Sequence, residues 1–559
     1  MRLTLTSAME LIEFLLKKSS YQFVLSGKFN QDCIEVVFRV ITFLLNALVL
    51  HNVDKEVLGI VNVRLMLLVM SILFVSREAF RRACMSKTRD HNWPQVVNLL
   101  WMTFPSVTLC SFLFCYVWLF MLELPSEKYV ADYIFAVYVL GVSCMLESFM
   151  EPIYIFSQAF LYVRWRVFVD SLTLFLRILI LVISVLYYPA LTIRTTAYAQ
   201  FLVSSLYLSL YWIYFHLQFQ KKAKLMKNKE LHRDDPLLSL PFNSVRDFLP
   251  RRIEGQNFIG NDMAILTWGF FKQGILKQVL TDGEKYVMTV FAVLSFAEQG
   301  VYDVVNNLGS MAARFIFLPI EESSYFYFAQ MLSRHVPIEK QKRSEIEQVS
   351  GVLRRLLRAL TLLGATIVIF GYSYSHLLLH LYGGKTLTDG SGPLLLKAHC
   401  LAVWLMAING VTEAYVFAAM NSDQLDKHNR LMVVFSIIFL FLSWLLSLLL
   451  GSVGFILANC VNMGLRITQS LRFIHKQYAS MNMNPLTGLI PTKLEMIAFA
   501  MSFIVTVSSL VFIYPDSAVT HVIVGAISGL SLVGTILFAE PELLQFLVSN
   551  VKKRIGKAD

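Results

Sequence analysis

The sequence predicts an all-α polytopic membrane protein with about fourteen transmembrane helices. Of the 559 residues, 56% are hydrophobic and 16% are charged, whereas soluble domains carry about 25% charged residues. Apolar runs of twenty or more residues alternate with short polar joints, and each run can cross a hydrocarbon core of ~30 Å as a helix. These observations exclude a soluble enzyme, a disordered chain and a disulfide-stapled module. A β-barrel is excluded too, because its strands alternate in and out.

The apolar runs give the expected order of elements. We expect spans at 32–52, 58–80, 96–122, 133–157, 167–188, 196–219, 267–296, 301–332, 356–381, 395–420, 431–450, 454–475, 494–514 and 519–538. We expect six regions, namely an N-terminal lead-in (1–31), an N-lobe with helices one to six (32–219), a cytoplasmic linker (220–264), a C-lobe with helices seven to twelve (265–475), two additional helices (476–540) and a basic cytoplasmic tail (541–559).

Lysine and arginine gather in alternate joints, which sets the orientation of the chain. Nine lie between Lys221 and Arg252 alone. The joints that follow odd-numbered spans together hold only four, Lys55, Lys128, Arg194 and Lys385. This asymmetry predicts an even number of spans and two cytoplasmic termini, and it accounts for much of the net charge of +11.

The two lobes have similar lengths and equal numbers of spans, which predicts a parallel repeat about the membrane normal. A faint sequence echo agrees with this repeat. Helix four carries Glu151 ahead of Tyr154, and helix ten carries Glu413 ahead of Tyr415.

Several ionisable residues occur inside the predicted spans, where a charge costs at least about 2.5–3.5 kcal/mol. Arg314 and Arg466 are too deep in apolar sequence to reach a membrane face easily, so we expect them to face a cavity. The charges that we count for this cavity are Arg39, Arg77, Arg314, Arg466, Glu284 and Glu413. Their sum is positive, and a desolvated guanidinium suits a phosphate or pyrophosphate. The sequence therefore predicts an arginine-lined cavity for an anionic headgroup.

A purely structural interpretation stays open for some of these charges. Arg77 and Arg81 lie near a membrane face, where their side chains can extend into the headgroups. Arg64 lies close to the lumenal third of helix two and can extend outward in the same way. Pro319 in helix eight and Gly410 in helix ten are expected bending points.

We expect no metal and no cofactor. His376 and His380 have no third ligand, and no CxxC pair occurs. No nucleotide-binding motif is present, so ATP hydrolysis is not expected. We expect a transporter rather than an enzyme. We expect membrane lipid to be a partner, and we do not expect nucleic acid to be one.

Several strings resemble those of the eukaryotic Rft-one family. They are 38–43 (FRVITF), 77–82 (REAFRR), 283–289 (GEKYVMT), 299–303 (QGVYD), 319–323 (PIEES), 407–413 (AINGVTE) and 451–460 (GSVGFILANC). The likeness runs from about residue 32 to 475. It implies the multidrug/oligosaccharidyl-lipid/polysaccharide exporter superfamily, whose members have two six-helix lobes around a V-shaped central cavity and work by alternating access.

The resemblance also implies a cargo and a set of site residues. The implied task is to move pyrophosphoryl-dolichol carrying five mannoses and two N-acetylglucosamines from the cytosolic to the lumenal leaflet of the endoplasmic reticulum, for N-linked glycosylation. The carried-over substrate-binding positions are Arg39, Arg64, Arg77, Arg81, Glu284, Arg314, Glu321, Glu413 and Arg466. The alternative is a non-transporting factor that binds or assembles the same lipid-linked oligosaccharide.

Overall fold

The computed structural model describes residues 45, 47–85, 92–188, 191–227, 240–334, 336–481 and 483–541. The regular elements in these ranges are all helices, which confirms the predicted fold class. The N-terminal lead-in, Arg39 and nearly all of the basic tail lie outside them. The contacts divide the chain into two compact units. We call residues 34–300 the N-unit, and the other unit, with described residues 301–541, the C-unit.

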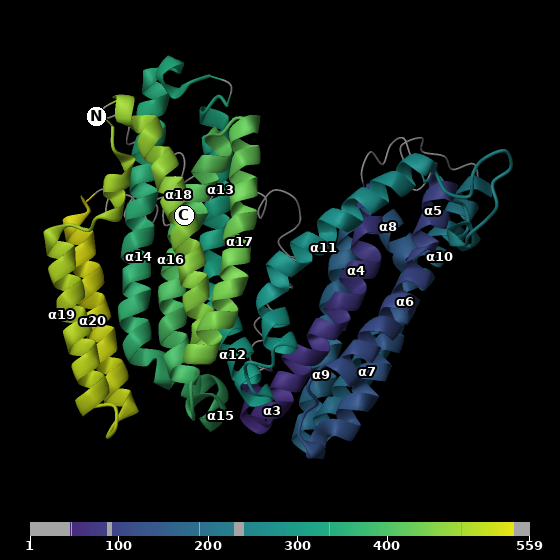
Figure 1. The fold of residues 1–559 in the computed structure, drawn as a ribbon, viewed down its shortest axis with the longest axis horizontal. Coiled ribbons are helices and arrows are strands. Elements are labelled where there is room, and N and C mark those ends of the chain that lie inside the picture. The colour runs from purple at the N-terminus through teal and green to yellow at the C-terminus, as the bar shows by residue number, and fades with distance from the viewer. Residues whose placement is uncertain are drawn as a thin grey trace. The chain divides into compact units, whose positions relative to one another are not determined.

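The N-unit is built from the elements between residues 55 and 290. They are α3 (Lys55–Leu58), η1 (Gly59–Leu65), α4 (Met66–Met85), α5 (Trp93–Trp101), α6 (Thr103–Tyr116), η3 (Val117–Met121), α7 (Glu127–Ser148), α8 (Glu151–Ala159), α9 (Val163–Tyr187), α10 (Thr192–Lys227), η5 (Val245–Phe248) and α11 (Asn261–Val290). Helix α4 packs against α6, α7 and α11, and α10 packs against α7 and α9. Figure 1 shows α11 as the teal helix that lies along α4.

One interruption in this unit positions a charged residue. The expected span 133–157 is divided, because α7 ends at Ser148 and α8 begins at Glu151. Pro152 lies in the first turn of α8, where its missing N–H group costs least. The new helix therefore starts with Glu151, whose side chain is completely buried.

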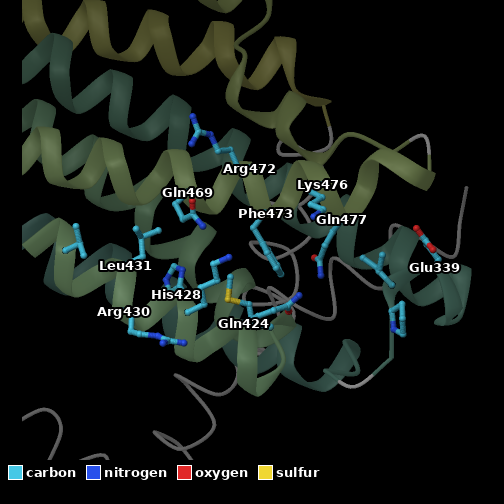
Figure 2. Close-up of a pocket in the computed structure, with 15 residues that line it drawn as sticks. Glu339, Gln424, His428, Arg430, Leu431, Gln469, Arg472, Phe473, Lys476 and Gln477 are labelled. Atoms are coloured by element: carbon cyan, nitrogen blue, oxygen red, sulfur yellow. The ribbon is translucent and has the colours of Figure 1, made fainter.

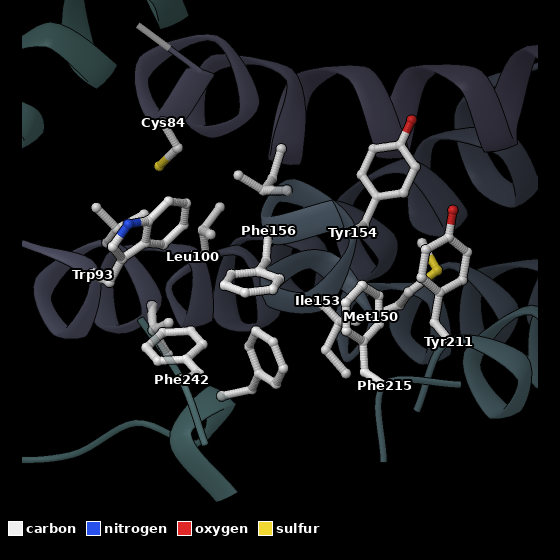
Figure 3. Packing of buried hydrophobic residues seen from close by; sticks show 14 of the residues in the cluster. Cys84, Trp93, Leu100, Met150, Ile153, Tyr154, Phe156, Tyr211, Phe215 and Phe242 are labelled. Carbon is white, nitrogen blue, oxygen red and sulfur yellow. The ribbon is translucent and has the colours of Figure 1, made fainter. Parts of the chain in front are cut away.

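An aromatic core holds one end of the N-unit together (Figure 3). Trp93 of α5, Phe156 of α8 and Phe215 of α10 meet there. Phe242, from the polar stretch between α10 and α11, stacks on Phe156 with ring centroids 5.1 Å apart. Phe248 meets Phe156 edge to face at 5.0 Å. The predicted linker thus contributes buried aromatic rings to the core of this unit.

Hydrogen bonds from buried polar side chains also fix the linker. Asn98 is fully buried and donates to the carbonyls of Arg251 and Phe258 at 2.8 and 2.9 Å. Lys222, at the end of α10, donates to the carbonyls of Leu240 and Phe242 at 2.8 and 2.9 Å. Buried donors and acceptors are costly when unpaired, so these bonds fix the path of the chain between α10 and α11.

The C-unit contains the elements that follow. They are α12 (Phe296–Gly309), which starts in the N-unit, η6 (Ala313–Phe317), α13 (Leu318–Met331), η7 (Ile338–Lys340), α14 (Arg343–Gly383), α15 (Lys385–Thr388), α16 (Gly392–Ala419), α17 (Ser422–Leu450), α18 (Ser452–Tyr478), η8 (Ala479–Met481), η9 (Pro485–Leu489), α19 (Lys493–Phe512) and α20 (Ala518–Ala539). Helix α16 packs against α13, α14 and α18. The yellow pair α19 and α20 in Figure 1 packs through α19 against α14.

Local sequence explains the breaks in the C-unit. A π-helical turn, η6, precedes α13, and Pro319 lies in the first turn of α13. The interruption of helix eight near Pro319 agrees with the predicted bending point. Helix α16 continues through Gly410 without interruption. Gly451 joins α17 to α18 with φ of 58°, which a glycine adopts without steric cost.

Nine helical segments of the described residues are long and apolar enough to cross a membrane. They lie at 55–85, 93–121, 127–148, 164–187, 343–383, 392–419, 422–450, 485–512 and 518–539. The chain is therefore a multi-pass helical membrane protein, as expected. The full number of fourteen spans stays a prediction.

Candidate functional site

Two arginines of α4 meet two glutamates inside the N-unit. Arg81 binds Glu151 with both arms of its guanidinium, through Nε at 2.8 Å and Nη2 at 2.6 Å. Arg77 Nη1 donates to Glu147 at 3.0 Å and to Glu151 at 3.3 Å. Charge-assisted bonds of this fork geometry are among the strongest in proteins. Both arginines are thus held by carboxylates, and neither extends freely into the headgroup region.

Arg77, Arg81 and Glu147 line a cavity of about 340 Å³ in the N-unit. Gln200 and Ser204 of α10 donate to Glu147 at 3.2 and 2.9 Å. Arg177 of α9 also lines the cavity. Within the described part of the chain, Arg177 has no hydrogen bond or ion pair. The charge of Glu147 nevertheless acts on Arg177, and Asp170 lines the same cavity.

Arg64 has a different environment. It is fully buried and donates from Nη1 to the carbonyl of Thr289 at 2.9 Å. Its guanidinium carbon lies 4.8 Å from the centre of the Phe296 ring. Thr289 is in the last turn of α11, where the helix dipole favours a positive charge. Arg64 thus caps α11, and its expected extension toward the lumenal surface is wrong.

The C-unit contains a second buried fork. Arg466 of α18 donates to Glu413 of α16 from Nε at 2.8 Å and from Nη2 at 2.7 Å. Glu413 is 5% exposed. The charges of both residues act on Glu321 of α13. A Cβ atom on Gly410 would lie 2.6 Å from Oε2 of Glu321, so this glycine permits the close approach of Glu321 to α16.

Glu151 and Glu413, which the sequence comparison of the two lobes pairs, have similar environments in the structure. Each is a buried glutamate that accepts Nε and Nη2 of one arginine. The arginines come from helices that do not correspond, α4 in the N-unit and α18 in the C-unit. The two units therefore share the buried carboxylate but not the origin of its partner.

Arg314 is the predicted site residue with the most accessible guanidinium. It lies in η6, is exposed, and donates from Nη2 to Ser310 Oγ at 2.7 Å and to Asn307 Oδ1 at 3.1 Å. Asn307 in turn donates to Asp303 at 3.0 Å. This row of polar side chains has a helical spacing and lies between apolar residues. Since polar side chains within a membrane normally face a cavity or a partner, the row is suited to a wet surface.

Glu284 lies in α11 and is half-buried. It therefore belongs to the N-unit, whereas Arg314, Glu321, Glu413 and Arg466 belong to the C-unit. The structure thus brings the predicted residues together as Arg77 with Arg81, and as Glu321 with Glu413 and Arg466. Arg64 and Arg314 bond to other partners within their units, and Arg39 is not among the described residues.

The sequence reasoning missed two carboxylate partners of the predicted arginines. Glu147 and Glu151 were left out of the charge count, and they neutralise Arg77 and Arg81. The signal was present, because both pairs have the spacing i, i+4 that places side chains on one helix face. Arg177 is one of the ionisable residues inside the predicted spans, but it was not counted for the cavity. The positive excess is therefore smaller than expected and, among the described residues, is clearest at Arg314.

Chemically, a guanidinium that only amide or hydroxyl groups hold can bind an incoming anion without first losing a carboxylate. Arg314 meets this condition through Asn307 and Ser310, whereas Arg177 shares its cavity with the carboxylates of Glu147 and Asp170. A fork–fork contact to phosphate oxygens needs such a planar, accessible group. The arrangement is therefore suited to binding a phosphate-bearing ligand.

The chain is similar to known proteins along most of its length. The family model described as Rft protein matches residues 31–550. The Man(5)GlcNAc(2)-PP-dolichol translocation protein RFT1 of Xenopus tropicalis is 43% identical over 525 residues, which are 93% of this chain and 95% of that protein. The protein of the same name from Mus musculus is 41% identical and covers 92% of this chain and 94% of its own.

A solved structure shows the same fold. It is the lipid II flippase MurJ in its inward closed conformation, with a TM-score of 0.54 and 12% sequence identity. The likeness covers 92% of this chain and 99% of the flippase. At this identity the likeness concerns the fold and not the residues of the site.

Proposed function

Because the chain belongs to the Rft protein family, we propose that it is a glycolipid flippase. Its cargo would be the pyrophosphoryl-dolichol-linked oligosaccharide, with five mannoses and two N-acetylglucosamines, that its relatives' names print. The movement runs from the cytosolic to the lumenal leaflet of the endoplasmic reticulum, with both termini cytoplasmic, and serves N-linked glycosylation. The observation that carries the proposal is the similarity over nine-tenths of both chains, supported by the flippase fold.

In the proposed mechanism, alternating access exposes a polar surface first to one leaflet and then to the other. Arg314 binds the pyrophosphate, because its guanidinium is exposed and is held only by Ser310 and Asn307 among the residues that the structure describes. The glycan occupies the wet space and the dolichol tail stays in lipid, which avoids moving the sugar hydroxyls through hydrocarbon. No bond of the cargo changes, so the chain acts as a transporter and not as an enzyme.

The paired residues have a supporting role in this mechanism. Arg77, Arg81 and Arg466 hold neighbouring helices together through Glu147, Glu151 and Glu413. Arg64 holds the end of α11. Glu321 lies close enough to the Glu413–Arg466 pair for the charges of that pair to act on it. We propose that these residues shape the units, and Arg39, which lies outside the described residues, stays a predicted headgroup-binding position.

The experiment is a reconstituted flipping assay. Purified protein in vesicles receives the pyrophosphate-linked glycolipid, and the fraction accessible from outside is followed over time. We expect faster exchange than in empty vesicles and a loss of this acceleration in Arg314→Gln. The matched control is Arg354→Gln, which removes an exposed arginine from α14 of the same unit.

Equal rates in protein-containing and empty vesicles would remove the flippase proposal. If the protein then still bound the glycolipid, the alternative of a non-transporting binding or assembly factor would take its place. Equal activity of Arg314→Gln and Arg354→Gln would leave the transport activity standing and would refute the role of Arg314.

A further inference from the structure

A basic pocket lies in the C-unit where α17 begins and α18 ends (Figure 2). Its volume is about 770 Å³. The lining residues from the two helices carry four cations, Lys427, Arg430, Arg472 and Lys476. None of the nine predicted site residues lies among its lining residues. We refer to it as the α17–α18 pocket.

Helical spacing explains how the two helices build this pocket. On α17, Lys427, Leu431 and Val434 follow each other at i, i+4 and i+7, so they lie on one face. On α18, Gln469, Phe473 and Lys476 repeat the same spacing. The helices pack against each other, and the two faces converge. The pocket therefore combines an apolar wall with cationic and amide groups.

The cations of the pocket are not neutralised by the protein. Lys427, Arg430, Arg472 and Lys476 make no ion pair with any described residue. Arg430 makes a hydrogen bond of 3.4 Å to the backbone carbonyl of Asp426. Glu339 is the lining carboxylate. The lining therefore has an excess of positive charge that an anion can occupy.

His428 provides an independent indication of a ligand. It lines the pocket, yet its side chain is 2% exposed. Neither ring nitrogen has a hydrogen-bonding partner among the residues that the structure describes, although buried polar groups normally have one. Phe417 meets the imidazole edge to face at 5.4 Å and orients it. A phosphate oxygen in the pocket would accept the missing hydrogen bond.

Membrane proteins carry an excess of lysine and arginine on their cytoplasmic side, which is enough to explain why cations occur at this end of the two helices. It does not explain why they line a hollow with an apolar wall and an unpartnered buried histidine. Beyond the pocket, the outer face of α17 continues with the exposed apolar side chains Val434, Ile437 and Phe441. A ligand with a charged head and an acyl chain satisfies both parts of this surface.

We propose that the α17–α18 pocket binds the phosphate-bearing headgroup of an anionic phospholipid from the leaflet that we predict to be cytosolic. Basic pockets between transmembrane helices on that side are typical sites for such headgroups. The volume exceeds what a bare phosphate needs and suits a polyol headgroup, to which the amides of Gln469 and Gln477 can donate. The acyl chains then lie along the apolar face of α17. None of the nine predicted cargo-binding residues lines this pocket, and the proposal does not depend on the proposed transport.

The test measures binding of phosphatidylinositol with a fluorescent acyl chain to the purified full-length protein in neutral detergent. The test variant is Arg430→Gln with Lys476→Gln, which removes one exposed cation from each helix. We expect about fivefold weaker binding for each charge removed. The matched control is Lys342→Gln with Arg343→Gln, two exposed cations of the same unit outside the pocket. We expect this control to bind as the parent does.

A second variant tests the buried imidazole. His428→Phe keeps an aromatic ring against Phe417 and removes both nitrogens, so we expect weaker phosphatidylinositol binding. If this variant fails to fold, the double variant Arg430→Gln with Lys476→Gln still tests the proposal, because both side chains are exposed. An equal loss of phosphatidylinositol binding in the control, Lys342→Gln with Arg343→Gln, would show a diffuse attraction to the charged surface. This result would overturn the proposal.

Competition distinguishes the sources of the phosphate. Unlabelled phosphatidylinositol should displace the probe, and inorganic pyrophosphate should displace it only weakly. Displacement by inorganic pyrophosphate at equal potency would show a site for free phosphate. Stronger displacement by a short polyprenyl pyrophosphate would assign the pocket to the cargo. Either result would refute the phospholipid as its ligand.

Discussion

Replacing Glu151 by glutamine tests whether the buried carboxylate holds the N-unit together. Glu151 is fully buried and accepts bonds of 2.6 and 2.8 Å from Arg81 and one of 3.3 Å from Arg77. Breaking such a pair costs about 3–5 kcal/mol, because the remaining charge is left buried without compensation. Arg77 keeps Glu147 at 3.0 Å, so only Arg81 loses its carboxylate. We therefore expect the lower end, about 3 kcal/mol.

The assay is thermal unfolding of the purified protein in detergent, followed by tryptophan fluorescence at one scan rate. A loss of about 3 kcal/mol corresponds to a fall in Tm of about 6–12 °C for a unit of this size. The control is Glu78→Gln on the same helix as Arg81. Its pair with Arg82 has side-chain exposures of 30% and 32%, so it contributes little. We expect the Tm of this control to stay close to that of the parent.

The double variant Arg81→Met with Glu151→Met removes both charges together. Replacing a whole buried pair by apolar residues of similar volume is often nearly neutral. We therefore expect the double variant to regain most of the Tm that Glu151→Gln loses. A parent-like Tm in Glu151→Gln, or a double variant as unstable as Glu151→Gln, would refute the structural role of this pair.

Three further predictions concern stability and expression. Arg466→Gln should lower protein abundance, because it leaves Glu413 buried without its cation, and in-gel quantification against Arg314→Gln checks this. Phe242→Ala should destabilise the N-unit by about 3–5 kcal/mol, seen as easier proteolysis between α10 and α11, whereas an unchanged cleavage rate would contradict the anchored linker. Gly364→Ala should lower the Tm, because its Cβ would lie 1.9 Å from a ring carbon of Trp404, and Gly269→Ala, with open space around it, is the control.

Part of the site could be read from the sequence. Arg314 is surrounded by apolar residues, so its accessible position follows from the cost of burying a charge in lipid. The pairing of Arg466 with Glu413 could not be read in the same way, because 53 positions separate the two residues. Their contact depends on how α16 packs against α18.

The linker shows a similar limit. Its high polarity predicts an exposed stretch, and its described charged residues Arg246, Arg251, Arg252 and Glu254 are indeed exposed. Phe242 and Phe248 nevertheless lie in the aromatic core, because Lys222 and Asn98 satisfy the backbone carbonyls around them. Two aromatic residues in a polar segment do not reveal whether a buried surface is available to receive them.

By itself, the sequence determined the class of the protein and the family to which it belongs. Long apolar runs and an uneven distribution of lysine and arginine are local features, and the physics of the bilayer acts on them directly. The tertiary structure decided which charges are free. Packing brings Glu151 to Arg81 and Glu413 to Arg466, and it leaves Arg314 with only amide and hydroxyl partners. Charge compensation depends on contacts between distant segments, so only the folded chain shows where an anion can bind.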